Sequence, residues 1–178
     1  MIVRFATPDH ASAIAAVEVA TWQAAYQELL PATFLQALSI NSKAQEWRNS
    51  LLKHRVGRQK RVLVALEGEE VVGFVRVGTA HEDQPIGLIY LLYVLPPYWK
   101  HGIGTELMQG AVHELIDLGH QAALLWVLRD NKRARQFYEH LGWRQDGRTT
   151  AVEYGDVSLQ ALCYQRSVQP LVSINQDV

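Results

Sequence analysis

A segment that is apolar on both of its faces, Leu88 to Val94, restricts the fold of this chain more than any other feature. It reads Leu-Ile-Tyr-Leu-Leu-Tyr-Val, without the alternation of polar and apolar residues that marks a half-exposed strand. Such a strand belongs in the interior of a sheet that has helices on both faces. After Pro96 and Pro97, a helical repeat at Ile103 to Leu115 and a strand at Ala122 to Leu128 follow. This order predicts a right-handed crossover and at least one parallel pair of strands.

The remaining segments extend this unit into a mixed α/β domain. Two β-branched runs meet at Glu67-Gly68-Glu69, which is typical of an antiparallel hairpin. Before the crossover unit, we expect a strand at 2–5, helices at 8–26, 30–38 and 42–51, and strands at 61–66 and 70–77. After it, we expect a helix capped by Asn131 and ended by Gly142, and then strands at 143–149 and 157–164. The crossover helix is expected to end near Gly119. The first helix is expected to bury one face, formed by Ile14, Val17 and Trp22.

Composition and charge exclude several classes of protein. The 178 residues are enough for one ordinary domain, and 48% hydrophobic with 20% charged residues is typical of a globular chain. A net charge of -1 argues against nucleic acid or an anionic membrane as the main partner. The single cysteine, Cys163, is expected to be a small buried residue, and no segment reads as a signal peptide or a membrane span. We therefore expect a cytoplasmic protein.

A pair of glycines stands where the crossover helix begins, in the turn from Trp99 to Thr105. The first amides of a helix have no partner within it and carry partial positive charge, and glycine lets an anion approach the backbone closely. Lys100 and His101 add positive charge beside Gly102 and Gly104. The turn lacks the ending of a Walker P-loop, and its glycines are too close together for a dinucleotide fingerprint. It therefore indicates either a phosphate site of another kind or only a tight connection.

A second motif runs from Asn131 to Trp143 and reads Asn-Lys-Arg-Ala-Arg-Gln-Phe-Tyr-Glu-His-Leu-Gly-Trp. Together the two motifs resemble those of the GNAT superfamily of N-acetyltransferases. That family has Gln/Arg-x-x-Gly-x-Gly/Ala after a buried strand that ends in Val-x-Pro, and then Asn-x-x-Ala-x-x-Phe-Tyr-Glu-x-Leu-Gly-Phe. The resemblance covers Arg4 to Arg166 and departs from the pattern at Trp99 and at Lys100, where a glycine is common.

The resemblance implies a single GNAT-like domain over residues 1–166. Residues 167–178, which include Pro170 and several polar residues without a clear period, are expected to form a loosely attached tail. Its sheet is expected to be mixed and mostly antiparallel, flanked by helices, with a central parallel strand pair that splays at the coenzyme site. The implied reaction is the transfer of an acetyl group from acetyl-CoA, as co-substrate, directly to an amine. A small-molecule primary amine is the expected acceptor, and a protein N-terminus or lysine is the alternative.

The same resemblance implies roles for individual residues. Tyr138 would protonate the departing thiolate and Asn131 would orient the site, while a core aromatic ring and a helix cap are their respective structural alternatives. Trp22, Tyr26 and Tyr90 would bind the acceptor, and plain packing is the alternative for Trp22. The residues expected to bind the coenzyme are Leu92, Tyr93, Val94, Lys100, His101, Gly102, Ile103, Gly104, Thr105, Asn131, Arg133, Ala134, Phe137 and Tyr138.

The sequence assigns no general base. Many members of the family have a glutamate in the buried strand, but the matching positions here are Leu88 and Tyr90. Tyr90 could instead relay a proton through water. Loop residues that could reach the acceptor, although each is more typical of a solvated surface, are Glu28, His81, Glu82 and Asp83.

Two interpretations from other functional classes stay open. The missing acid and Trp99 favour a module that binds acyl-CoA as a sensor with little turnover, whereas a turn that holds no phosphate would indicate an interaction domain. The seven histidines show no metal-ligand spacing, so no metal is expected. A homodimer is compatible with the sequence, which does not specify one.

Overall fold

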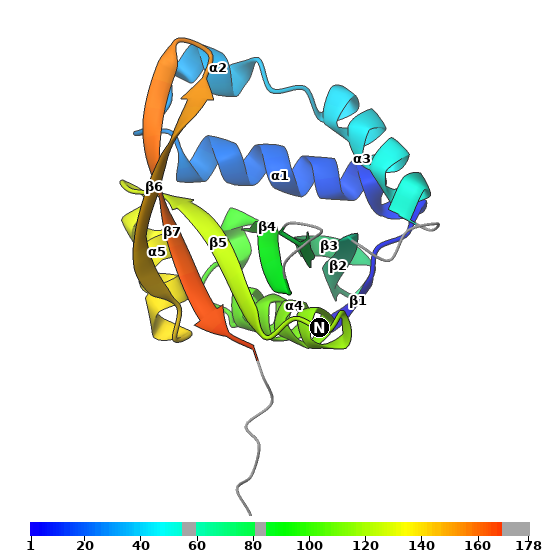
Figure 1. Cartoon of the computed structure of the whole chain (residues 1–178). Helices are drawn as coiled ribbons and strands as arrows, with labels where there is room; N and C mark the ends of the chain where they lie inside the picture. Colours follow the sequence, from blue (N-terminus) through cyan, green and yellow to red (C-terminus); the bar gives the residue numbers. More distant parts are fainter. Residues whose placement is uncertain (55–59, 81–84, 169–178) are drawn as a thin grey trace, which may run out of the picture.

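The apolar strand lies at the centre of the sheet, as predicted. It is β4 (Ile86–Val94) in the computed structural model, which describes residues 1–54, 60–80 and 85–168. The strand order is β1-β2-β3-β4-β5-β7-β6 (Figure 1). Every neighbouring pair is antiparallel except β4 and β5, which are the two strands joined by the crossover. The predicted mixed, mostly antiparallel sheet is therefore confirmed.

Most of the expected elements are present, with bounds close to those predicted. The strands are β1 (Ile2–Phe5), β2 (Lys60–Glu67), β3 (Glu70–Thr79), β4, β5 (Ala122–Leu128), β6 (Arg144–Tyr154) and β7 (Val157–Ser167). The helices are α1 (Ala11–Ala25), α2 (Ala32–Gln36), α3 (Ile40–His54), α4 (Ile103–Asp117) and α5 (Lys132–His140), with 3-10 turns η1 (Pro8–His10) and η2 (Pro96–Tyr98). Gly119 and Gly142 follow their helices in the left-handed conformation, with φ 85° and 82°.

Two boundaries differ from those expected. α3 begins at Ile40 rather than Ser42, because Ser39 Oγ accepts a hydrogen bond from Ser42 N at 3.2 Å and so acts at the start of the helix. β6 and β7 are longer than predicted, because they pair with each other along one extended hairpin. The first two residues of the predicted tail are not loosely attached, because Ser167 belongs to β7 and Val168 is buried in the core, and the rest, from position 169 onward, lies outside the described residues.

Helices cover both faces of the sheet, so the core has two halves. α4 packs against the sheet on one face through side chains such as Leu107 and Leu115, which are fully buried. On the other face, α1 and α3 pack against β2 and β3 through Ile14 and Trp47. Figure 1 shows α1 and α3 on one side of the strands and α4 on the other.

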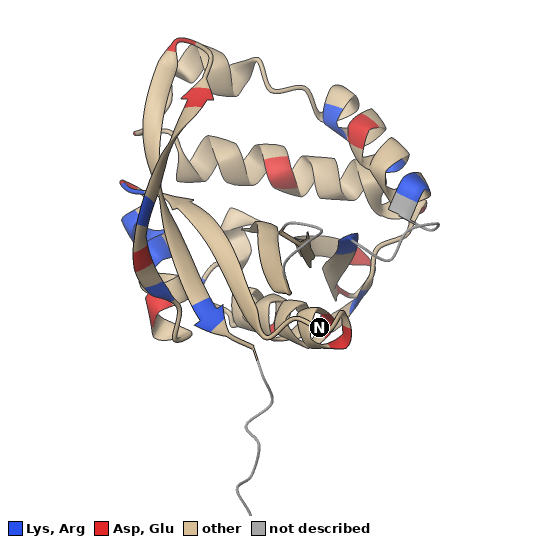
Figure 2. Ribbon diagram, in the orientation of Figure 1, with Lys and Arg blue, Asp and Glu red and all other residues tan. Residues whose placement is uncertain are grey.

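A buried carboxylate fastens α3 to α1. Glu18 is the only charged residue of α1 (Figure 2) and is 5% exposed. One of its oxygens accepts a hydrogen bond from Trp47 Nε1 at 2.6 Å, and the other forms an ion pair with Lys43 Nζ at 3.1 Å. Because both oxygens have partners, the charge is tolerated inside the protein. These contacts hold α1 in place against α3.

Gly73 leaves no room for a side chain between β3 and β4. A Cβ atom there would lie 3.0 Å from the carbonyl oxygen of Tyr93 and 3.0 Å from Leu107 Cδ1. We expect Gly73→Ala to lower the free energy of unfolding by about 1–3 kcal/mol in urea denaturation, because the backbone of β4 would have to move.

The matched control is Gly110→Ala in α4. The atom nearest to the added methyl group, Leu63 Cδ1 at 3.0 Å, is the end of a flexible side chain. Inside a helix alanine is favoured over glycine by about 1 kcal/mol, so this variant should be neutral or stabilised. If Gly73→Ala is as stable as Gly110→Ala, β4 is not held rigidly at Gly73.

Candidate functional site

β4 and β5 pair over only part of their length and then separate. Their parallel pairing ends at Ile89 opposite Leu125. The next residue, Tyr90, is an extra residue in β4 where the register against β3 shifts, which is the pattern of a β-bulge and bends the strand. Beyond it, β4 stays paired with β3 as far as Val94 opposite Gly73. The predicted splay of the central parallel pair is confirmed, and no described strand pairs with the β5 side of this segment.

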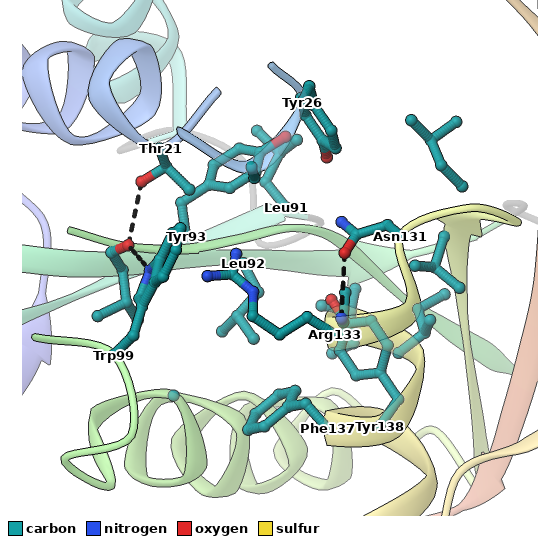
Figure 3. A pocket seen from close by; sticks show the side chains of 18 of the residues that line it. Thr21, Tyr26, Leu91, Leu92, Tyr93, Trp99, Asn131, Arg133, Phe137 and Tyr138 are labelled. Carbon is teal, nitrogen blue, oxygen red and sulfur yellow. Dashed lines mark hydrogen bonds between the residues drawn. The ribbon is translucent and has the colours of Figure 1, made fainter. Parts of the chain in front are cut away.

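The gap between the two strands belongs to a pocket of about 700 Å³ (Figure 3). Its walls come from α1, β4, the turn before α4, β5, α5 and β6, so it passes through the sheet from the α4 face to the α1 face. The predicted site residues that line it are Trp22, Tyr26, Tyr90, Leu92, Tyr93, Val94, Lys100, Gly102, Gly104, Thr105, Asn131, Arg133, Ala134, Phe137 and Tyr138.

Several other predicted residues lie elsewhere. The side chain of His101 is exposed and that of Ile103 is buried in the core, so within the described chain neither lines the pocket. Glu28 is exposed and lies outside the pocket lining, and residues 81–83 lie outside the described residues. Tyr90 lines the pocket, but its hydroxyl donates a hydrogen bond to a β3 carbonyl at 2.7 Å. None of the described candidates is thus a free base at the centre of the pocket.

The turn before α4 leaves backbone amides without helical partners. Gly102 caps the helix in the left-handed conformation, with φ 83°. The first helical hydrogen bonds run from Thr105 N and Glu106 N to Gly102 O. The amides of Ile103 and Gly104 precede these bonds and carry the partial positive charge of a helix N-terminus. No atom lies within 4 Å of the place that a Cβ on Gly102 would occupy, so an anion has room to approach.

Trp99 occupies the first position at which the chain departs from the family pattern. Its Nε1 donates to the carbonyl oxygen of Val94 at 2.6 Å, and the Thr21 hydroxyl donates to the same oxygen at 3.1 Å (Figure 3). The guanidinium carbon of Arg133 lies 3.1 Å from the centre of the Trp99 ring, as in a cation–π contact. The sequence analysis missed Thr21 and this stack, because the partners are distant in the chain and no local pattern joins them.

The Arg133 guanidinium has an aromatic neighbour but no counter-charge of its own. The residue is exposed as a whole, and partial desolvation lowers its pKa from the ordinary arginine value. Among the described residues no carboxylate forms an ion pair with it. Its charge is therefore available to an anion in the pocket.

Three tyrosines and Asn131 form the polar centre of the pocket. Burial raises the pKa of Tyr26 to about 12 and raises the pKa values of Tyr93 and Tyr138, and neighbouring tyrosine hydroxyls add to each shift. All three phenols therefore stay protonated near neutral pH and can donate hydrogen bonds. Asn131 Oδ1 accepts from Ala134 N at 3.1 Å, which confirms the predicted helix cap, and the Asn131 side chain also contacts Tyr26.

Aromatic rings wall the pocket on its α1 side. The ring centroid of Trp22 lies 5.2 Å from that of Tyr26 and 5.6 Å from that of Tyr154. Trp126 on β5 also lines this side. Trp22 is thus part of the pocket wall and not of the buried core face that was expected for α1. The sequence analysis missed Tyr154 and Trp126, which join α1 at the pocket through tertiary folding.

A family profile and several proteins of known sequence match this chain. The profile of the Acetyltransferase (GNAT) family matches residues 21–143. An uncharacterized N-acetyltransferase of Archaeoglobus fulgidus is 41% identical over 81 residues, which is 43% of this chain and 55% of the relative. The chain thus spans about half the length of that relative. The uncharacterized N-acetyltransferase YuaI of Bacillus subtilis is 27% identical over 132 residues, 72% of each chain.

A solved structure shares the fold. The PaiA N-acetyltransferase from Thermoplasma acidophilum, crystallised in complex with coenzyme A, matches with a TM-score of 0.76 at 16% identity. The match covers 93% of this chain and 98% of that one. Among the described residues, no helix is both long and apolar enough to cross a membrane. Within the same residues, no three His, Cys, Asp or Glu side chains gather as metal ligands.

Lys100 is the only described residue other than glycine with a positive φ, 66°. This conformation costs a residue with a side chain roughly 1–2 kcal/mol. We expect Lys100→Gly to raise the free energy of unfolding by up to about 1 kcal/mol, since the freedom of glycine in the unfolded chain offsets part of the gain. Lys100→Ala keeps the strain and controls for the lost charge. If both variants unfold at the same urea concentration, the turn is not strained.

Proposed function

The chain belongs to the acetyltransferase (GNAT) family, and we propose that it transfers an acetyl group from acetyl-CoA directly to the primary amine of a small molecule. The observation that carries the proposal is a single pocket that joins the glycine turn, the separated strands β4 and β5, and the side chains of Asn131 and Tyr138. Both sequence motifs therefore contribute to one site. A protein N-terminus or lysine is the alternative acceptor.

The glycine turn suits the pyrophosphate of coenzyme A. Unpaired amides at the N-terminus of α4 attract an anion, and Gly102 and Gly104 add no side chain that would keep it away. Lys100 and Arg133 line the same part of the pocket and supply positive charge. Trp99, fixed by its bond to Val94, would hold the Arg133 guanidinium in position. In this way the Arg133–Trp99 pair offsets the departure from the family pattern.

β4 and Tyr138 provide the two groups that acetyl transfer from a thioester needs. An amide of β4 between Leu92 and Val94 would donate a hydrogen bond to the thioester oxygen, where negative charge develops. Tyr138, kept protonated by burial, would donate its proton to the departing sulfur. The C–N bond forms as the C–S bond breaks, and the proton that the nitrogen sheds restores the phenol through solvent. No covalent enzyme intermediate is needed.

A second candidate function is an acyl-CoA sensor with little turnover. The pocket lining favours it, because the described lining residues include no Asp or Glu to deprotonate an amine. Tyr138 and Asn131 favour catalysis instead, because a sensor needs neither a proton donor nor a group that orients the reacting atoms. Thiol release distinguishes the two functions.

Tyr138→Phe removes the proposed proton donor and keeps the ring. We expect kcat to fall by about 10²–10⁴-fold, with little change in the binding of acetyl-CoA, in a free-thiol assay over a panel of amines. Because burial raises the pKa of Tyr138, the wild-type rate should show no loss from ionisation of this residue up to the ordinary tyrosine value of 10.0. Binding of acetyl-CoA without thiol release from any amine would favour the sensor.

Arg133→Ala tests the cation at the coenzyme site. We expect the Kd for acetyl-CoA to rise about tenfold, since one charge-assisted contact is worth about 1.5 kcal/mol or more. The matched control is Lys132→Ala, which removes the same charge from the neighbouring residue, exposed and outside the pocket lining. Titration calorimetry measures both variants. If both variants raise the Kd for acetyl-CoA equally, the coenzyme is attracted by the overall charge of the protein and not by a direct contact with Arg133.

A further inference from the structure

From the walls of the pocket on its α1 side, we infer that the acceptor is a monoamine attached to an aromatic or other apolar group. We infer also that enclosure in these walls, rather than a carboxylate base, delivers the amine in its neutral form. The inference rests on the proposed acetyl transfer and names the substrate class of that site. The walls form an acceptor chamber that consists of Trp22, Tyr26, Leu91, Trp126, Val152 and Tyr154.

The chamber presents ring surfaces from several elements. The rings of Tyr26 and Tyr154 each meet that of Trp22 edge to face, at 5.2 and 5.6 Å, so the three form one continuous wall. Phe34 of α2 supports this wall, with its ring 6.5 Å from that of Trp22 and 6.1 Å from that of Tyr154. The four rings therefore support one another in the wall.

Trp126 leaves apolar surface uncovered inside the pocket. It is 40% exposed, although its neighbours on β5, Leu125 and Val127, are buried. All three residues line the pocket, and Trp126 is the one of them that keeps substantial exposed surface. Apolar surface left open in a concave site is the usual mark of a ligand that covers it. A flat or apolar group on the acceptor would do so.

The charge of the lining excludes acceptors that carry several ammonium groups. Lys100, Arg133 and His140 line the pocket, whereas none of its described lining residues is Asp or Glu. An ammonium group that leaves water needs a carboxylate or comparable partner to offset the loss of hydration. A polyamine or a lysine-rich peptide would leave such groups without a carboxylate partner among the described lining residues. A monoamine leaves none once its nitrogen is neutral.

The chamber also accounts for the absence of an acid at Leu88 and Tyr90. Apolar surroundings disfavour an ammonium, so the amine gives its proton to solvent as it enters and its pKa falls. Tyr26 and Tyr93, close together in the pocket (Figure 3), can then accept hydrogen bonds from the amine nitrogen through their hydroxyl oxygens. The nitrogen lone pair is left for attack on the thioester carbon.

The first test compares acceptors with the wild-type enzyme and acetyl-CoA, measured by thiol release. We expect kcat/KM for 2-phenylethylamine to exceed that for spermidine by about tenfold or more. The amine of 2,2-difluoro-2-phenylethylamine is less basic than that of 2-phenylethylamine. With the fluorinated amine, the rising limb of the pH profile of kcat/KM should therefore move to lower pH by the difference between the pKa values of the two amines. A limb at the same pH for both would indicate a base on the enzyme and overturn the inference, as would a preference for spermidine.

The second test uses Trp126→Ala. We expect KM for 2-phenylethylamine to rise about tenfold, while KM for acetyl-CoA stays within about twofold, because Trp126 belongs to the chamber and not to the glycine turn. The control is Leu52→Ala on α3, which removes a side chain that is 47% exposed and outside the pocket. An unchanged KM for the amine would overturn the inference that this chamber binds the acceptor. If no amine of any class releases thiol, acetyl transfer itself fails, which is a different result from a changed preference among amines.

Discussion

The separation of β4 from β5 is the constraint on which the rest of the structure depends. Backbone groups that leave a sheet must find other partners or face solvent. The carbonyl of Val94 finds two, the Thr21 hydroxyl from α1 and the Trp99 indole from the turn. One oxygen thus ties the first helix and the glycine turn to the end of the same strand. From the bulge at Tyr90 to Val94, the side of β4 that faces β5 stays open to the pocket.

The turn before α4 combines features with opposite effects on stability. Gly102 adopts its left-handed conformation without cost, whereas Lys100 adopts a similar one at the expense of strain. Gly104 has a further purpose, because a Cβ on it would lie 3.2 Å from the Phe137 ring. Glycine here lets α4 and α5 approach each other. The same small residue therefore leaves room for a ligand on one side and packs against an aromatic ring on the other.

α5 carries the second motif and is held against β7 by a polar network. The Tyr164 hydroxyl of β7 donates to Glu139 Oε1 at 2.7 Å and accepts from Arg135 Nε at 3.1 Å. Tyr138, one turn after Arg135, is buried in the same core cluster as Tyr164. The position of the proposed proton donor thus depends on contacts with β7 that lie outside the pocket. Rigid support of this kind is what a preorganised site requires.

The sequence by itself determined the elements of the sheet and the two motifs, because these follow from local patterns. The apolar run of β4, the left-handed glycines and the Asn131 cap each depend on residues within a few positions of one another. Tertiary structure alone decided the α1 side of the pocket and the role of Trp99. The neighbours of Trp22 and of Trp99 come from segments far away in the chain. Local periodicity predicts which side chains are buried, but the contacts between distant segments arise from how the elements pack.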